Sequence, residues 1–479
     1  MYDVCIIGAG VVGMNIAREL AKYQVRVCVL ERKDDVGCGC SKANSGIVHG
    51  GYSDHPGTRK AELCVKGNQM YAQLDSELHF GYRKTGSLVL AFTNEELPKL
   101  QELYEQGVKN GVSGLAILTA EQTRQKEPHL SENIAGALYC ENAGVTSPYE
   151  FVIALAENAV QNGVELKLNH EVVSIEQANE FFLIHTSQAP ITTRFVINSA
   201  GIYSDKIAGM VGLTQYQLSP RRGQYVVLDK DQNYLVNSVI FQVPSKLGKG
   251  ILVTTTYHGN LMIGPNAEEI GDKDDVGTDA KTLEYITETA RKSVPGFNMR
   301  RALRSFAGNR PISNQEDWII EESKVKRFIN LVGIDSPGLT SSPAIALEVI
   351  TILRQAGLTL TINPNFRPQR PPIIQKKAAT FSGSIDVADP TEHLLCRCEQ
   401  VTEAEIVDSL HRGIPLRSVD AVARRTRAGF GSCQGAFCGP RVRALIAKEL
   451  GLAPEEILER NPSSSALVER AKRPELFSL

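Results

Sequence analysis

Short apolar runs and a helical pattern alternate at the start of the chain. Residues 3–8 form a continuous apolar run of the kind found in buried parallel strands. Val12, Ile16 and Leu20 then recur at helical spacing, and a second apolar run follows at 25–30. The pattern predicts a strand, a helix and a second strand, which together form a βαβ unit.

The pattern continues with further helices and strands through most of the chain. It predicts helices over 95–110, 148–163 and 344–355, and strands over 164–175, 181–186, 194–197 and 328–332. Additional strands over 225–228, 251–255 and 261–263 suggest an antiparallel sheet. We therefore expect an α/β fold, α+β overall, in which this second sheet is inserted between pieces of the first domain.

The composition of the chain changes at Asn363, where prolines become frequent. Four prolines within ten residues resist both helix and sheet, so we place a linker over 363–393. A second, compact module follows over 394–450, with helices over 402–412 and 440–450. Thr402 and Glu405 have the spacing of a capping box at the start of the first of these helices. Residues 451–479 are then a C-terminal tail.

Composition narrows the class of protein. The chain has 479 residues, 42% hydrophobic and 22% charged, with a formal net charge of −2. This profile is that of a multidomain globular protein and argues against a nucleic-acid binder, which needs a basic excess. No apolar run reaches the roughly 20 residues of a membrane helix, and Tyr2 and Asp3 lead into a strand rather than a signal segment. We expect a cytoplasmic protein, with peripheral membrane attachment through a partner left open.

The βαβ unit carries a glycine motif. Gly8, Gly10 and Gly13 follow the first strand as G-x-G-x-x-G, and Glu31 ends the second strand. The glycines allow a tight turn, close approach of a pyrophosphate and close helix–strand packing, while the helix N-terminus attracts phosphate. The acid can accept hydrogen bonds from ribose hydroxyls. The motif predicts a dinucleotide site and, by itself, does not separate FAD from NAD.

The second module contains two cysteine pairs. Cys396 and Cys398 are spaced as C-x-C, and Cys433 and Cys438 as C-x4-C. Four thiolates can hold a metal centre, but zinc knuckles favour C-x2-C spacing. A [2Fe–2S] cluster accepts four cysteines and transfers single electrons. We expect this cluster, with zinc as the alternative.

Three segments add a family resemblance to the glycine motif. Residues 41–51, 195–205 and 333–343 resemble the flavin-binding segments of the D-amino-acid-oxidase-like, FAD-dependent superfamily. The resemblance covers about residues 1–360 and implies a body over 1–362 with a glutathione-reductase-type FAD domain. Its FAD-binding segments would be about 1–80, 148–215 and 325–362, and its substrate sheet about 81–147 and 216–324.

The resemblance also implies which residues contact FAD. Besides the three glycines and Glu31, these are Arg32, Ser41, Asn44, Ser45, Gly46, Val172, Ala200, Gly201, Gly333, Ser336, Gly338, Leu339 and Thr340. The cysteine module, over about 394–445, resembles the bacterioferritin-associated-ferredoxin-like [2Fe–2S] domain.

A flavin and a one-electron cluster on one chain favour a dehydrogenase over an oxidase. The combination resembles the catalytic A subunits of anaerobic glycerol-3-phosphate dehydrogenases, which implies oxidation of sn-glycerol 3-phosphate to dihydroxyacetone phosphate. Segments 44–51 and 56–65 resemble L-2-hydroxyglutarate dehydrogenases more closely, so another 2-hydroxy acid, or an amino acid, is the alternative. A non-catalytic electron-transfer or iron-handling protein is an alternative of another class. The implied partners are a small anionic substrate and an electron-acceptor protein or subunit.

Four residues are candidates for the chemistry. His49, in the segment expected beneath the flavin, and His258, on the substrate sheet, are alternative bases for the hydroxyl proton. Arg310 matches the arginine of the superfamily's G-x-R-P segment, which implies that it binds the substrate anion; an arginine fork suits a carboxylate or phosphate. Arg222 is a second candidate for this role.

Overall fold

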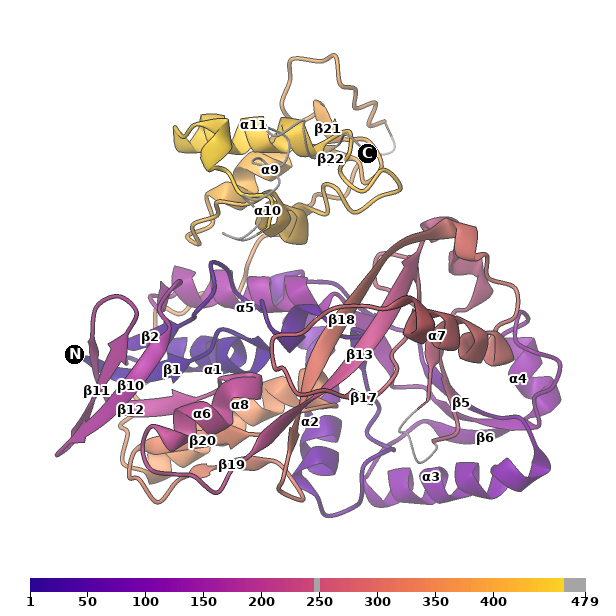
Figure 1. Ribbon diagram of the computed structural model, residues 1–479, viewed down its shortest axis with the longest axis horizontal. Coiled ribbons are helices and arrows are strands. Elements are labelled where there is room, and N and C mark those ends of the chain that lie inside the picture. The colour runs from indigo at the N-terminus through magenta and orange to yellow at the C-terminus, as the bar shows by residue number, and fades with distance from the viewer. Residues whose placement is uncertain (245–249, 379, 461–479) are drawn as a thin grey trace, which may run out of the picture. The chain divides into compact units, whose positions relative to one another are not determined.

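The computed structural model describes residues 1–244, 250–378 and 380–460 (Figure 1). Most of the tail expected over 451–479 therefore lies outside the described residues. The chain divides into two compact units, Met1–Arg370 and a second that begins at Pro371. No helix among the described residues has the length and apolar character needed to cross a membrane.

The first unit contains the expected βαβ motif. Strand β1 (Tyr2–Ile7) leads into helix α1 (Val11–Ala21), and β2 (Val27–Leu30) pairs with β1 in parallel. The parallel part of this sheet continues through β12 (Ile191–Asn198) to β20 (Phe328–Val332) on one side and β9 (Glu165–Lys167) on the other. Antiparallel strands β10 (Val172–Ala178), β11 (Phe181–Thr186) and β19 (Ile319–Glu322) complete the sheet.

The run over 164–175 differs from its prediction as one strand. It contains two elements, β9 and the start of β10, with Asn169 between them in the left-handed region at φ 57°. A left-handed residue interrupts extended backbone, and the chain changes partner here: β9 pairs with β2, whereas β10 pairs with β11. The change of partner explains why the stretch predicted as one strand forms two.

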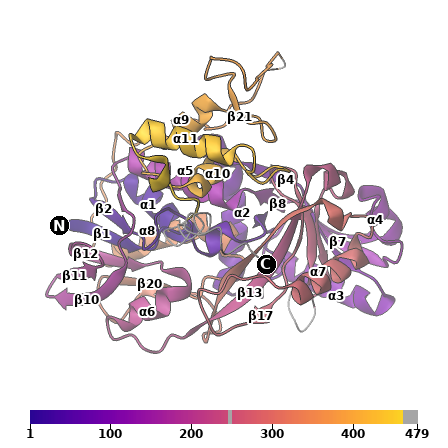
Figure 2. The same cartoon turned by 45° about the horizontal axis from the view of Figure 1, so that its top comes forward.

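Helices cover both faces of this first sheet (Figures 1 and 2). α1 packs against α5 (Pro148–Gln161) and α8 (Gly338–Gln355), and α6 (Ser204–Gly209) lies against β12 and β20 on the other face. Sequence reasoning missed α2 (Arg59–Leu78), which Thr58 caps by accepting a hydrogen bond from the Ala61 N–H. Its signal was present, since six of its seven buried residues recur at three- and four-residue spacing: Ala61, Cys64, Gly67, Tyr71, Leu74 and Leu78.

The second sheet is built from two separate stretches of chain. β5 (Ser87–Ala91), β6 (Leu115–Thr119) and β7 (Gly136–Cys140) come from the first stretch, with helices α3 (Leu97–Lys109) and α4 (Ala120–Lys126). The second supplies the remaining strands and one helix: β13 (Leu218–Leu228), β14 (Val239–Gln242), β15 (Leu252–Thr255), β16 (Leu261–Gly264), β17 (Glu268–Glu269), α7 (Ala280–Ser293) and β18 (Ala302–Ser313).

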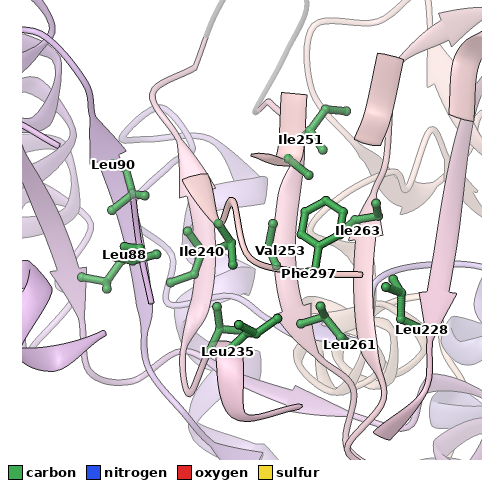
Figure 3. Close-up of a cluster of buried hydrophobic side chains, with 14 of the residues drawn as sticks. Leu88, Leu90, Leu228, Leu235, Ile240, Ile251, Val253, Leu261, Ile263 and Phe297 are labelled. Carbon is green, nitrogen blue, oxygen red and sulfur yellow. The ribbon is translucent and has the colours of Figure 1, made fainter. Parts of the chain in front are cut away.

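The expected antiparallel second sheet is confirmed, and it contains one parallel pair that the sequence did not predict. β14 pairs with β5 in parallel, whereas the other pairings of this sheet are antiparallel. This pair joins the two stretches, and no hairpin connects them, so nothing imposes opposite directions. A buried apolar cluster spans the join, with Leu88 and Leu90 beside Ile240 and Val253 (Figure 3).

A small three-stranded sheet supports the loop that follows β2. It consists of β3 (Ile47–Val48), β8 (Gly144–Thr146) and β4 (Tyr82–Lys84), in that order and antiparallel. Gly46, just before β3, has φ +65°, and a Cβ there would lie 2.5 Å from the Thr146 carbonyl oxygen. The loop between β2 and β3 is therefore held closely against this sheet.

The second unit is mainly helical. Strands β21 (Leu394–Cys396) and β22 (Val401–Thr402) precede α9 (Glu403–Leu410), α10 (Val419–Thr426) and α11 (Gly439–Leu450). The predicted capping box is confirmed: the Glu405 N–H donates to Thr402 Oγ1, and the Thr402 N–H donates to the Glu405 carboxylate at 2.9 Å.

The start of the expected linker belongs to the first unit. The Asn363 N–H donates to the Lys22 carbonyl at 2.8 Å, and Arg370 Nε donates to Glu157 Oε2 at 2.7 Å. The side chains of Arg370 and Glu157 are 6% and 4% exposed. Residues 363–370 therefore form no helix or strand, as their prolines predicted, but Arg370 at the end of this stretch still forms a buried ion pair.

Candidate functional site

One cavity of about 690 Å³ lies in the first unit, between residues of the two large sheets. It brings together predicted residues that are far apart in sequence. Those that line it are Gly8, Gly10, Glu31, Arg32, Ser41, Asn44, Ser45, His49, Val172, Ala200, Gly201, Arg310, Ser336, Gly338 and Leu339.

The glycine turn at the cavity leaves no room for side chains. Gly8 has φ +106°, and a Cβ there would lie 2.6 Å from the Ser199 carbonyl oxygen. A Cβ on Gly13 would lie 2.1 Å from the Gly8 carbonyl oxygen, so α1 packs directly on the turn. Gly10 is the N-cap of α1 and lines the cavity. The start of α1 therefore presents backbone N–H groups and the positive helix end to a diphosphate.

Glu31 is held at the cavity with both carboxylate oxygens engaged. Oε2 accepts from the Ala9 N–H at 2.9 Å and Oε1 from the Lys33 N–H at 3.0 Å. Burial raises the pKa of this carboxyl, and the two N–H donors oppose that shift. Each carboxylate oxygen can accept more than one hydrogen bond, so Glu31 retains capacity for ribose hydroxyls.

The segment from Ser41 to His49 is fixed by its own hydrogen bonds. Ser41 Oγ accepts from the Val11 N–H at 2.9 Å, and the Asn44 amide donates to the Ser41 carbonyl at 3.0 Å. The His49 N–H donates to Thr340 Oγ1 at 2.9 Å, which ties this segment to the first turn of α8. The loop and the helix that were both expected to hold the flavin are thus connected.

Four of the predicted cofactor residues do not line the cavity: Gly13, Gly46, Gly333 and Thr340. The structure gives them supporting places instead. Gly333, for example, has φ +74° at the end of β20, where the chain turns toward α8. These residues shape the cavity wall without touching its interior.

Arg310 lies in the cavity in a space left by a glycine. Its Nη2 donates to the Asn266 carbonyl at 2.6 Å. A Cβ on Gly223, which pairs with Gly308 in the neighbouring strand, would lie 2.7 Å from that same Nη2. Arg310 keeps further N–H donors, so its guanidinium can receive an anion.

The structure places the two candidate bases differently, and likewise the two candidate arginines. The His49 ring lines the cavity and stacks on Phe241, with centroids 6.0 Å apart. His258 does not line the cavity, and its Nε2 lies 2.7 Å from Glu150 Oε1. Arg222 also lies outside the lining residues, in ion pairs with Glu268 and Asp275.

Tyr225 is a cavity residue that sequence reasoning missed. Its ring stacks on Phe306 with centroids 4.6 Å apart, and burial raises the pKa of its phenol to about 12. It is therefore a neutral hydroxyl group near pH 7. The sequence contained a signal for it. Tyr225 is two residues from Gly223 on one strand, so both face the same side of the sheet, and Arg310 lies beside Gly223.

The four predicted cysteines of the second unit meet as two pairs. Cys398 Sγ lies 3.9 Å from Cys433 Sγ. The thiol of Cys438 donates to Cys396 and, with the backbone N–H groups of Glu399 and Gly429, lowers the pKa of Cys396 to about 6. All four are free of disulfides.

The donor set fits a two-iron cluster. Such a cluster takes two thiolates per iron and is tuned by N–H groups directed at sulfur. Backbone N–H groups of Gly435 and Phe437 point at Cys433 in the same way as those at Cys396. The two pairs together supply the four thiolates that a two-iron cluster requires.

Two protein families match the two units. The FAD dependent oxidoreductase family matches residues 3–351, and the BFD-like [2Fe-2S] binding domain matches residues 394–448. The first match covers most of the chain and contains the cavity, and the second contains all four cysteines. The cofactors are therefore FAD in the first unit and a [2Fe–2S] cluster in the second.

Relatives agree with this division. Glycerol 3-phosphate dehydrogenase from Caloramator mitchellensis is 47% identical over 98% of both chains. The structure of L-alpha-glycerophosphate oxidase from Mycoplasma pneumoniae, with FAD bound, matches with a TM-score of 0.74 and 31% identity. It covers 77% of this chain and 98% of its own. Human mitochondrial L-2-hydroxyglutarate dehydrogenase is 31% identical over 56% of this chain and 61% of its own length.

Proposed function

The chain belongs to the FAD dependent oxidoreductase family and carries a BFD-like [2Fe-2S] binding domain, and we propose that it is a dehydrogenase of sn-glycerol 3-phosphate. In this proposal the secondary alcohol is oxidised to dihydroxyacetone phosphate in the cavity of the first unit. Electrons then leave through the second unit to an acceptor protein or partner subunit.

One observation carries the proposal: the similarity to the Caloramator dehydrogenase includes the cysteine unit. That relative matches along 98% of both chains, whereas the Mycoplasma oxidase is matched along 98% of itself but only 77% of this chain. An oxidase delivers electrons to oxygen and needs no cluster, whereas a one-electron carrier gives a dehydrogenase a separate exit.

Arg310 supports an anionic substrate. The guanidinium is oriented by the Asn266 carbonyl and lies on the wall of the cavity. A planar fork binds phosphate or carboxylate with two parallel hydrogen bonds. Tyr225, on the adjacent strand, adds a neutral hydroxyl to the same cavity.

His49 is the base in this proposal. When bound, FAD would supply the acceptor for the hydride on the carbinol carbon. The imidazole of His49 takes the hydroxyl proton, for which a neutral ring near pH 7 is suited. Its backbone is fixed by Thr340 and its ring by Phe241, so it is held in one place. His258, engaged with Glu150 outside the cavity lining, is not used.

The alternative substrate is a 2-hydroxy acid such as L-2-hydroxyglutarate. An arginine fork also binds a carboxylate, and the human relative named above acts on that compound according to its name. We also propose a cytoplasmic location, with membrane association, if any, through the acceptor partner.

An anaerobic titration of FAD- and cluster-loaded protein tests the proposal. Glycerol 3-phosphate should bleach the flavin absorbance and then produce the electron paramagnetic resonance signal of the reduced cluster. L-2-hydroxyglutarate at equal concentration should do neither. Bleaching by hydroxyglutarate alone would replace the proposed substrate, and bleaching by neither would remove the proposal.

Two histidine variants make the test specific. His49→Asn should slow bleaching by at least about a hundredfold, within the range for loss of a general base. His258→Asn is the matched control, since it removes the same ring outside the cavity, and its bleaching rate should equal that of the unaltered protein. The reverse pattern would assign the base to His258.

A further inference from the structure

The second unit exposes part of its cysteine centre at its surface. Cys398 is exposed and Cys433 half-buried, whereas Cys396 and Cys438 are buried. Phe437 lies between Cys433 and Cys438 in the loop before α11, and 42% of its surface is exposed. A redox centre that must exchange electrons with another molecule needs such an accessible edge.

Two arginines flank the exposed ring. The guanidinium carbon of Arg441 lies 4.5 Å from the Phe437 ring centroid, and that of Arg397 lies 5.4 Å from it. We call Arg397, Cys398, Cys433, Phe437 and Arg441 the cluster-edge surface. It consists of an aromatic ring between two cations, together with the exposed Cys398 and the half-buried Cys433.

These two cations differ from the other arginines nearby. Arg427 is paired with Glu399 at 2.8 Å, and Arg443 is paired with Glu459. Among the residues that the structure describes, Arg397 and Arg441 have no acidic partner. The cluster-edge surface is therefore a patch of uncompensated positive charge.

Helix stability does not account for Arg441. It lies in the first turn of α11, which contains no acidic residue. A cation there opposes the helix dipole, whereas α9 of the same unit has Glu403 and Glu405 in its first turn. The helix end and Arg441 together increase the positive potential beside the cysteines.

We propose that the cluster-edge surface docks an acidic one-electron carrier protein, which accepts electrons from the cluster. The cations would steer a negatively charged surface to the exposed cysteines, and Phe437 would supply an apolar contact at the centre. Each transfer moves one electron from the reduced cluster to the carrier and breaks no bond. This inference depends on the electron exit in the proposed function, so its test measures flavin reduction separately.

Oxidised rubredoxin, a small acidic one-electron carrier, and cytochrome c, a basic one, serve as probes. Anaerobic reduction of each is followed by absorbance with the substrate that bleaches the flavin, and binding of rubredoxin is measured by calorimetry. Arg441→Glu and Arg397→Glu should each raise the KM and Kd for rubredoxin about tenfold and lower the KM for cytochrome c. The rubredoxin KM of the unaltered protein should also rise with salt.

Lys448→Glu is the matched control. Lys448 is exposed on the same helix, about two turns from Arg441, and the substitution changes the net charge equally. It should leave both probe KM values unchanged, and all variants should keep the unaltered rate of flavin bleaching and the cluster's resonance spectrum. Phe437→Ala should raise the rubredoxin KM without altering its salt dependence.

Three results would overturn the proposal. The first is an unchanged rubredoxin KM and Kd in both arginine variants. The second is a change in cluster potential that by itself accounts for slower reduction of both probes, which would restrict the arginines to balancing cluster charge. The third is slower transfer of electrons from the flavin to the cluster in the arginine variants. That result would mean that the cluster-edge surface contacts the first unit of this chain rather than a carrier protein. Loss of flavin bleaching in the unaltered protein would instead refute the proposed function.

Discussion

Replacing Gly223 by alanine tests whether the space beside Arg310 controls recognition of the substrate anion. The added Cβ would lie 2.7 Å from Arg310 Nη2, 2.8 Å from Pro265 Cβ and 3.3 Å from the Asn266 carbonyl oxygen. The φ of Gly223 is not in the left-handed region, so alanine is compatible with its backbone. The effect therefore comes from crowding alone.

The contacts predict the size of the effect. Crowding in a packed region costs about 1–3 kcal/mol of stability, and the end of the arginine side chain is the part best able to move. Movement away from the Asn266 carbonyl would disturb the charge-assisted contact that we propose between Arg310 and the substrate, which is worth about 1.5–3 kcal/mol. The corresponding loss in kcat/KM is about tenfold to about a hundredfold, because 1.4 kcal/mol is one factor of ten.

The assay compares two substrates in steady-state turnover with an artificial one-electron acceptor. Glycerol 3-phosphate should lose kcat/KM mainly through a higher KM, whereas glycerol, which lacks the anion, should be affected less than threefold. Gly271→Ala is the control, since a Cβ there meets nothing within 4 Å. FAD content, measured after release, should be the same in all three proteins.

Equal losses for glycerol and glycerol 3-phosphate would refute the reasoning, because they would show general damage to the cavity rather than displacement of Arg310. Unchanged kinetics in a correctly folded variant would also refute it. That result would mean that the arginine position tolerates the added methyl group.

Three further substitutions probe other parts of the first unit. Gly13→Ala would bring a Cβ to 2.1 Å from the Gly8 carbonyl oxygen, so the purified protein should lack FAD, as the absorbance spectrum will show. Arg370→Met leaves Glu157 buried without its ion-pair partner, and urea unfolding should reveal a loss of about 3–5 kcal/mol; adding Glu157→Gln should restore part of it. Asp279 caps α7, and hydrogen bonds from Gln224 and Thr282 lower its pKa to about 2. A carboxyl whose pKa is lower in the folded state than in the unfolded state stabilises the protein when the pH is above the unfolded-state pKa, and this stabilisation is lost as the pH falls through 2. Asp279→Ala should therefore reduce the thermal midpoint at pH 7, and the reduction should become progressively smaller below pH 4.

The sequence carried a large part of the site because that part is local. The turn from β1 into α1 depends on glycines within six residues, and Glu31 follows at the end of the next strand. The capping box at Thr402 is equally local, and it formed as its spacing predicted. The cysteine pairs were visible because the four cysteines lie close together in the chain and are spaced unlike a zinc knuckle.

Other features required long-range contacts that no local pattern records. Helix α2 packs so closely on α8 that a Cβ on Gly67 would lie 2.1 Å from the Thr340 carbonyl oxygen. The parallel join of β5 with β14 depends on two stretches meeting that no hairpin connects. Neither follows from hydrophobic periodicity, which reports that a residue is buried and not what buries it.

The choice among candidate side chains shows the same division. The sequence offered both Arg310, through its G-x-R-P segment, and Arg222 as residues that could bind the substrate anion. The tertiary structure placed Glu268 and Asp275 against Arg222, and left beside Arg310 a glycine, a carbonyl oxygen and the cavity. The sequence alone determined which chemical groups this protein possesses, whereas their usefulness depended on neighbours contributed by distant segments, because a side chain's charge can be used only where folding has not already neutralised it.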